Sequence, residues 1–133
     1  MRIDIRYPPP AREGETRIDW ERRALRPWRM DEKQRLFRER GTICERCRMQ
    51  PAQDLDEGCV PRCDMRGFSL EQRRIAFSSA NLFLLCVDCN RNQAHQREWA
   101  FEQSCSRYGE QAVREWYGSL DLKAPDRRFM PEI

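Results

Sequence analysis

Cys44-Glu-Arg-Cys47 and Cys86-Val-Asp-Cys89 are the two stretches of this sequence that decide its expected fold. Two residues between thiols let both sulfurs reach one tetrahedral ion at about 2.3 Å, and two such pairs complete a four-thiolate site. A site closed by four protein ligands leaves no open position for a substrate, and its metal binding is coupled to folding. We therefore predict a structural zinc ion held by Cys44, Cys47, Cys86 and Cys89. Redox chemistry and unpaired core thiols are the alternatives.

Three further cysteines bring the total to seven. Cys59 and Cys63 are separated by three residues and could form a second metal site with His95, the only histidine, although no fourth ligand is evident. Cys105 falls on an apolar stripe and is expected to be a small buried hydrophobe. An odd number of cysteines and a start without an apolar segment are typical of a reducing compartment, so we expect a cytoplasmic protein.

The composition is that of a small domain with a thin core. Of the 133 residues, 39% are hydrophobic and 35% are charged, so we expect one domain that a metal helps to hold together. The longest apolar run, Leu82–Val87, is far shorter than the roughly 20 residues of a membrane-spanning helix, and we expect no membrane segment. Four Trp, six Phe and three Tyr argue against full disorder.

Proline, glycine and hydrophobic periodicity divide the chain into parts. Residues 1–18 contain Tyr7-Pro-Pro-Pro10 and predict a flexible arm, residues 19–117 a folded domain, and residues 118–133 a loosely held tail. Pro27 is expected to interrupt or restart the first helix of the domain. The patterns predict helices at 21–26, 27–40, 70–77, 87–107 and 110–117, and strands at 53–60 and 81–86. The helix at 87–107 is expected to bury one stripe, made of Ala94, Phe101, Cys105 and Tyr108.

Three stretches of the chain resemble HNH-type endonucleases. Trp28–Cys47 resembles the lead-in helix and first zinc knuckle of that family, Asp56–Arg62 resembles its first catalytic strand and turn, and Asn81–Asn92 resembles its central strand, second knuckle and helix start. Tyr108-Gly-Glu-Gln-Ala-Val113 resembles the lambdoid-phage recombination nucleases within the group. The resemblance implies an α+β fold, with a zinc-stabilised ββα-metal (treble-clef-like) finger flanked by helices and inserted beside a DNA phosphate.

The same resemblance implies roles for individual residues. Asp56 and Asn90 would hold a divalent ion, Mg²⁺ or Mn²⁺, and Asn81 would order the loop that carries the general base. Where the family has a histidine as that base, this chain has Gly58-Cys59. Cysteine is a poor substitute, because hard Mg²⁺ prefers oxygen, and a lost base costs on the order of 10²–10⁴ in rate. His95 could replace the base, but on one helix it would lie roughly 140° from Asn90, so a surface or packing role is the alternative.

Arginine dominates the basic residues. Among 25 lysines and arginines, only Lys33 and Lys123 are lysine, and arginine suits bidentate phosphate contacts and stacking. A compositional bias toward arginine is the alternative explanation. Arg62 and Arg91 flank the expected site and are predicted to contact phosphate. Other arginines could join them or form a solvated, charge-balanced face: Arg66, Arg73, Arg74 and Arg97.

The sequence therefore favours a nucleic-acid-binding protein, with DNA as the expected partner, on an HNH-like zinc fold whose catalytic site is degenerate. An active Mg²⁺- or Mn²⁺-dependent DNA endonuclease is the first alternative. The second is a protein-interaction adaptor in which the zinc finger is only a scaffold. In that case the N-terminal arm or residues 110–117 would dock the partner.

Overall fold

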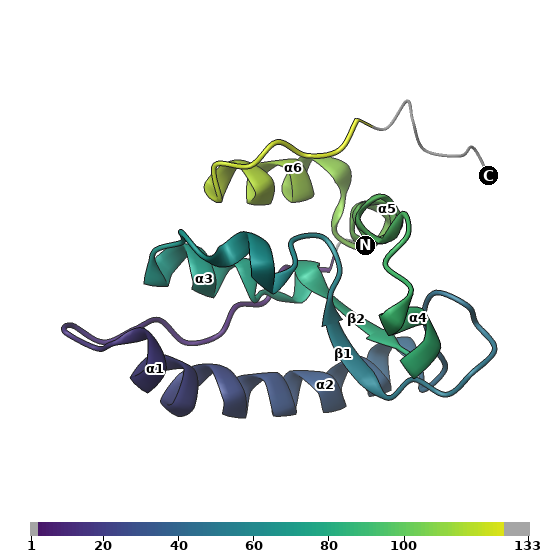
Figure 1. The fold of residues 1–133 in the computed structure, drawn as a ribbon, viewed down its shortest axis with the longest axis horizontal. Helices are drawn as coiled ribbons and strands as arrows, with labels where there is room; N and C mark the ends of the chain where they lie inside the picture. The colour runs from purple at the N-terminus through teal and green to yellow at the C-terminus, as the bar shows by residue number, and fades with distance from the viewer. Residues whose placement is uncertain (1–2, 127–133) are drawn as a thin grey trace.

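A two-stranded antiparallel sheet lies among helices in the computed structural model, which describes residues 3–126 (Figure 1). Strand β1 (Asp54–Glu57) pairs with β2 (Leu82–Leu85), in a register that sets Asp54 opposite Leu85 and Glu57 opposite Leu82. The predicted α+β class is confirmed. Residues 127–133 of the expected tail lie outside the described part of the chain.

Helices cover both faces of the sheet, and this explains why every residue of β2 is buried. Leu82 and Leu84 pack on Leu36 of helix α2 (Arg26–Arg40) and form one apolar cluster. Phe83 and Leu85 point to the other face and belong to the larger core, because side chains alternate along a strand. β1 is shorter than the predicted strand at 53–60.

The first helices form one continuous rod despite Pro27. Helix α1 (Arg17–Trp20) runs into a π-helical stretch, Glu21–Leu25, and then into α2 (Figure 1). Proline cannot donate a backbone hydrogen bond and crowds the preceding turn, and the wider π turn directly before it accommodates this defect. The rod is not interrupted at Pro27, but α2 starts at Arg26 with Pro27 in its first turn, so the predicted restart is confirmed, as is the predicted end of the helix at Arg40. Gly41 follows with a φ of 89°.

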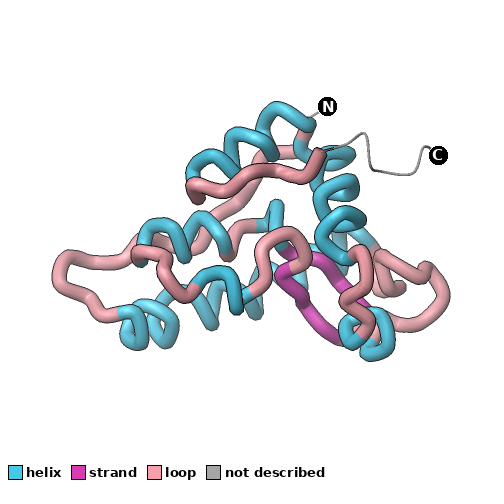
Figure 2. Tube along the Cα trace, turned by 45° about the horizontal axis from the view of Figure 1, so that its top comes forward, coloured by secondary structure: helices cyan, strands magenta, loops and turns pink. Residues whose placement is uncertain are grey.

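The long helix predicted at 87–107 is wrong. The structure has two helices, α4 (Val87–Arg91) and α5 (Gln96–Tyr108), joined by a loop (Figure 2). His95 adopts a φ of 57° in that loop, and the guanidinium of Arg46 donates to the carbonyls of Asn92 (2.7 Å) and Ala94 (2.5 Å). These carbonyls find their partner in another segment, so the helix breaks without leaving them unpaired. Ala94 is exposed and is not part of the buried stripe, which keeps Phe101, Cys105 and Tyr108.

Two more helices complete the domain. Helix α3 (Leu70–Ala76) starts with a capping box between Ser69 and Gln72, as the hydroxyl and amide side chains predict. Helix α6 (Glu110–Ser119) packs on α5, with Trp116 and Tyr117 in the core. Short 3-10 turns at Arg62–Met65 and Ser79–Asn81 connect β1 to α3 and α3 to β2.

The N-terminal segment, expected to be a flexible arm, is extended and packed against the domain. In Figure 1 it runs between the α1–α2 rod and α3. The backbones of Arg6 and Ser79 pair at 2.9 Å, and the indole of Trp20 donates to the carbonyl of Pro9 at 2.9 Å. The Arg6 guanidinium also binds the buried carboxylate of Glu32 at 3.0 Å.

Candidate metal centre and basic groove

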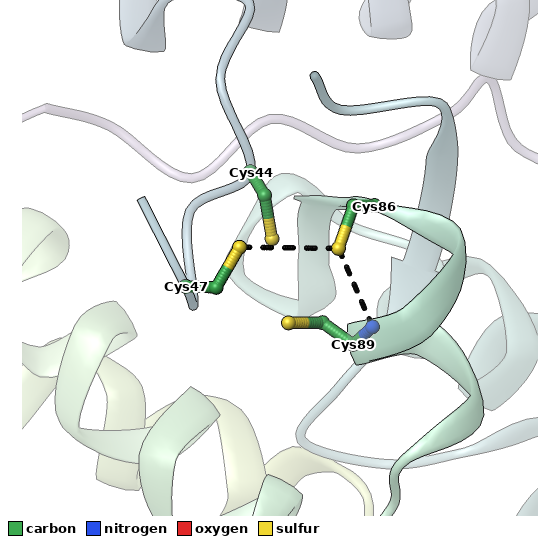
Figure 3. Close-up of side chains that lie close together, drawn as sticks. All are labelled: Cys44, Cys47, Cys86 and Cys89. Atoms are coloured by element: carbon green, nitrogen blue, oxygen red, sulfur yellow. Dashed lines mark hydrogen bonds between the residues drawn. The ribbon is translucent and has the colours of Figure 1, made fainter. Parts of the chain in front are cut away.

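Four cysteine thiols meet beside the sheet (Figure 3). Cys44 and Cys47 come from the loop after α2, Cys86 follows β2 as the N-cap of α4, and Cys89 lies in the first turn of α4. Their sulfur atoms all lie within 4.8 Å of one another, and those of Cys47 and Cys86 are 3.9 Å apart. A tetrahedron with 2.3 Å metal–sulfur bonds has edges of about 3.8 Å. The cluster is therefore compatible with a zinc-type metal, as the spacing predicts.

The shifted pKa values of these thiols are also compatible with a bound cation. Burial opposes ionisation of Cys44, but backbone N–H groups around it outweigh burial and lower its pKa to about 6. Burial and the neighbouring sulfurs raise the pKa of Cys89 to about 12. Four thiolates at this distance repel one another, and a divalent metal removes that repulsion because it binds the deprotonated form.

The residue after Cys44 fixes the first pair to the rest of the domain. The Glu45 backbone donates to Leu84 at 2.9 Å, and the Leu84 backbone donates back to the Glu45 carboxylate at 2.5 Å. This carboxylate is buried and also forms ion pairs with Arg40, at 3.2 Å, and with Arg107. Glu45 thus joins the cysteine loop to β2, α2 and α5.

The two residues that the resemblance assigns to a divalent ion have different partners. The Asn90 side-chain amide donates to Asp54 at 3.0 Å, whereas Asp56 accepts from Gln96 at 2.6 Å. Burial raises the pKa of Asp56, and the hydrogen bond from Gln96 partly opposes that rise. Within residues 3–126, the four-cysteine cluster is the only set of three or more His, Cys, Asp or Glu side chains close enough to share an ion. Nothing in this geometry supports a Mg²⁺ or Mn²⁺ site.

The place expected for the general base is filled by the core. A Cβ atom on Gly58 would meet the ring of Phe83 at 2.8 Å and the side chain of Ala100 at 2.9 Å. Cys59 is buried, and burial raises the pKa of its thiol to about 12. The sulfur points to the Ala80 carbonyl at 3.8 Å. A neutral thiol in this position is neither a base nor a metal ligand.

His95 and Cys63 do not join Cys59. Cys63 is exposed on the turn after β1, and its thiol contacts Asp64. His95 is exposed in the loop between α4 and α5, so the 140° rotation expected on one continuous helix does not apply. The second cysteine site considered from the sequence is absent from the described residues.

Asn81 is buried at the end of the 3-10 turn just before β2 and holds the loop after β1. Its side-chain oxygen accepts from the backbones of Cys59 (2.8 Å) and Val60 (2.9 Å). Its amide donates to the carbonyls of Val60 and Ala76, both at 2.9 Å. One side chain therefore satisfies four backbone groups, the geometry that a loop-ordering residue needs.

An arginine hollow of about 470 Å³ lies between the α1–α2 rod and the segment from the turn after β1 to α3. Its basic lining residues are Arg17, Arg26, Arg29, Arg62, Arg66 and Arg73. Glu57 accepts from Arg29 and Arg62, each at 3.0 Å. Arg26, Arg66 and Arg73 have no ion pair with any described residue. Burial and the nearby Arg17 lower the pKa of Arg73, and the carboxylate of Glu21, which also lines the hollow, partly opposes that shift.

A second hollow of about 520 Å³ adjoins the first, and Arg26 and Arg29 line both. Its other lining residues are Met30, Lys33, Asp54, Leu55 and Asn90. The sequence alone did not identify Arg17, Arg26 or Arg29. Residues 26, 29 and 33 recur at helical spacing, and this pattern could have revealed a basic face.

The remaining predicted phosphate contacts lie outside the arginine hollow. Arg74 binds the Pro8 carbonyl at 2.8 Å and Glu71 at 2.9 Å, so it serves to hold the N-terminal segment. Arg97 pairs with Asp64 at 3.1 Å. Arg91 is exposed on α4. Arg62, Arg66 and Arg73 are the predicted residues that the fold brings together.

No helix within residues 3–126 is both long and apolar enough to cross a membrane. The chain matches no protein-family model, no curated protein and no solved structure. The HNH resemblance therefore depends on the residues of this chain alone.

Proposed function

We propose that this protein binds nucleic acid through the arginine hollow, on an HNH-like finger stabilised by zinc, and that its catalytic site is degenerate. The observation that carries the proposal is the convergence of six arginines on one hollow, three of them without an ion-pair partner. Guanidinium groups match phosphate geometry and gain most where no carboxylate already neutralises them.

Two features of the fold support the HNH-like part of this proposal. The order of the elements is a cysteine pair, a strand, a second strand and a cysteine pair that opens a helix. Asn81 binds the loop after β1 with all of its side-chain hydrogen-bonding groups. Both features are what the resemblance implies.

The degenerate site follows from the residues around Gly58. A general base at this position has no room beside Phe83 and Ala100. Cys59 and His95 do not take over its place, since one is buried and the other lies in an exposed loop. An active endonuclease remains the alternative that the cleavage assay below tests.

The adaptor hypothesis finds less support. Trp116 and Tyr117, the aromatic residues of the segment 110–117, are each 3% exposed and belong to the core. The N-terminal segment is docked along the domain through Arg6 and Pro9. Neither is presented to a partner as the hypothesis requires.

Salt-dependent binding of a labelled DNA oligonucleotide, followed by fluorescence anisotropy, tests the proposal. Arg26→Ala and Arg66→Ala change two exposed arginines of the hollow, and each should weaken binding and reduce the slope of log K against log [salt] by about one. Arg38→Ala is the control. It removes an exposed arginine of α2, the helix of Arg26, that does not line the hollow, and it should leave the slope unchanged. Absence of binding at low salt would overturn the proposal.

The same preparations incubated with supercoiled plasmid and Mn²⁺ separate binding from cleavage. The degenerate site predicts no nicking above the background. Nicking that Asn90→Ala abolishes would replace this function with that of an active endonuclease.

A further inference from the structure

We infer that the second hollow receives one unpaired nucleobase while the arginine hollow holds the adjoining phosphates, so that the ligand is a single-stranded nucleic acid. This inference depends on the proposed function and adds to it the form of the ligand and the group that is read. It starts from the different chemistry of two hollows that share Arg26 and Arg29.

The second hollow differs from the first in its lining. Beside the cations of Arg26, Arg29 and Lys33 it carries the carboxylate of Asp54, and a phosphate placed next to that carboxylate is disfavoured. Met30, with 72% of its surface exposed, and the half-buried Leu55 supply apolar surface at the same place. This combination fits a flat group that is apolar on its face and polar at its edge.

Asp54 and Asn90 supply the polar contacts for such an edge. Their side chains are joined by one hydrogen bond of 3.0 Å, from the Asn90 amide to one Asp54 oxygen. The other Asp54 oxygen and the side-chain oxygen (Oδ1) of Asn90 have no hydrogen bond with any described residue. Two acceptors side by side select a base edge that carries N–H donors, as the amino group of cytosine or adenine does.

Arg26 and Arg29 connect the site for the base to the site for the phosphate. They line both hollows, so a phosphate bound to them lies next to the Met30 surface.

A duplex cannot present an unpaired base to the second hollow. Its bases are stacked and paired inside, and moving one into a protein pocket costs unstacking and unpairing energy. A single strand displays unstacked bases with free edges, and proteins bind it by combining a basic groove with contacts to base faces. The two hollows together have this arrangement.

The test compares binding of labelled oligo-dC, oligo-dT and a duplex of the same length, at neutral pH and one salt concentration. The natural protein should bind oligo-dC about five- to tenfold more tightly than oligo-dT, whose bases lack the amino donor, and should bind the duplex most weakly. Asp54→Asn replaces an acceptor by an amide, and it should bring the oligo-dC and oligo-dT affinities together. Asp121→Asn makes the same change of charge at an exposed turn after α6 and should keep the preference.

The outcomes separate this inference from the proposed function. Equal binding of oligo-dC and oligo-dT by the natural protein, or a preference that Asp54→Asn leaves intact, overturns the base-reading hollow. Tighter binding of the duplex overturns the single-stranded ligand. In each of these cases the arginine hollow is still supported if Arg66→Ala weakens binding. Failure to bind any of the three probes at low salt overturns both.

Discussion

Single residues in this fold are determined by the space and the hydrogen-bonding groups around them. Gly58 follows β1 at a point where the ring of Phe83 and the methyl group of Ala100 leave no room for a side chain. Asn81 lies nearby with its oxygen and amide completely used by backbone groups. The first residue is therefore defined by packing, and the second by hydrogen bonding.

Gly58→Ala should lower the free energy of unfolding by about 1–3 kcal/mol, because an added methyl group overfills the core. Chemical denaturation followed by tryptophan fluorescence measures this effect. Gly58→His should destabilise the protein further and should not create Mn²⁺-dependent nicking. A folded Gly58→His variant that nicks plasmid would show that this position is an open catalytic site. Gly67→Ala is the matched control, because a Cβ atom there meets nothing within 4 Å.

Asn81→Ala should cost about 3 kcal/mol or more, because it leaves buried backbone groups of Cys59, Val60 and Ala76 without partners. Asn81→Asp keeps the acceptor but sets a buried carboxylate against the Val60 and Ala76 carbonyls, so it should cost at least as much as Asn81→Ala. Urea unfolding midpoints give the ranking. A loss below about 0.5 kcal/mol for Asn81→Ala would contradict the loop-ordering role.

Between elements, charged side chains of the first cysteine loop provide the connections. The two residues between Cys44 and Cys47 point in different directions: Glu45 contacts β2, α2 and α5, and Arg46 caps the loop between α4 and α5. Arg46 also donates to Gln96 at 2.5 Å, next to the place where α5 starts. The loop thus contacts the chain on both sides of the second cysteine pair, at Leu84 before it and at Asn92 and Ala94 after it.

Glu45→Ala should lower the free energy of unfolding by about 3–5 kcal/mol, because it removes the buried carboxylate that the half-buried Arg40 and Arg107 share. Glu71→Ala, which removes an exposed ion pair with Arg74, should cost less than about 1 kcal/mol. Guanidinium chloride unfolding of the two variants compares them directly. Equal losses would show that the buried network does not hold the cysteine loop.

At the scale of the whole molecule, a metal would join segments that are far apart in the sequence. The four thiols link the loop after α2 to the junction of β2 and α4. The apolar part of the chain is small for its length, at 39%, and a cross-link between distant segments offsets part of the entropy lost on folding. The arginine hollow is also a product of this scale, because the α1–α2 rod forms one side and the segment from the turn after β1 to α3 forms the other.

Removing the metal should destabilise the whole domain. Elemental analysis should find one tightly bound zinc ion per chain, and a strong chelator should lower the thermal midpoint and the free energy of unfolding by several kcal/mol. Acidification should act in the same direction, because protons compete with zinc for the thiolates. Cys63→Ser changes an exposed cysteine outside the cluster and should keep the metal, whereas Cys47→Ser should lose it. A chain free of zinc with an unchanged midpoint would contradict the metal centre.

The sequence by itself determined the features that depend on local spacing. The two Cys-x-x-Cys pairs predict one four-thiol cluster, and the fold brings these sulfurs within 4.8 Å. The apolar run at 81–86 predicts a buried strand, and Gly41 predicts the end of the helix before it. Each of these features can be predicted from a short stretch of residues, because the spacing within that stretch sets its local geometry.

Only the tertiary structure decided the features that depend on a partner from elsewhere in the chain. The break between α4 and α5 requires Arg46, which lies more than forty positions earlier in the sequence. The filled position at Gly58 requires Phe83 and Ala100, and the arginine hollow requires α1, α2 and α3 together. Packing and long-range hydrogen bonds override local preference at such places, because burial and pairing energies exceed the small differences between local conformations.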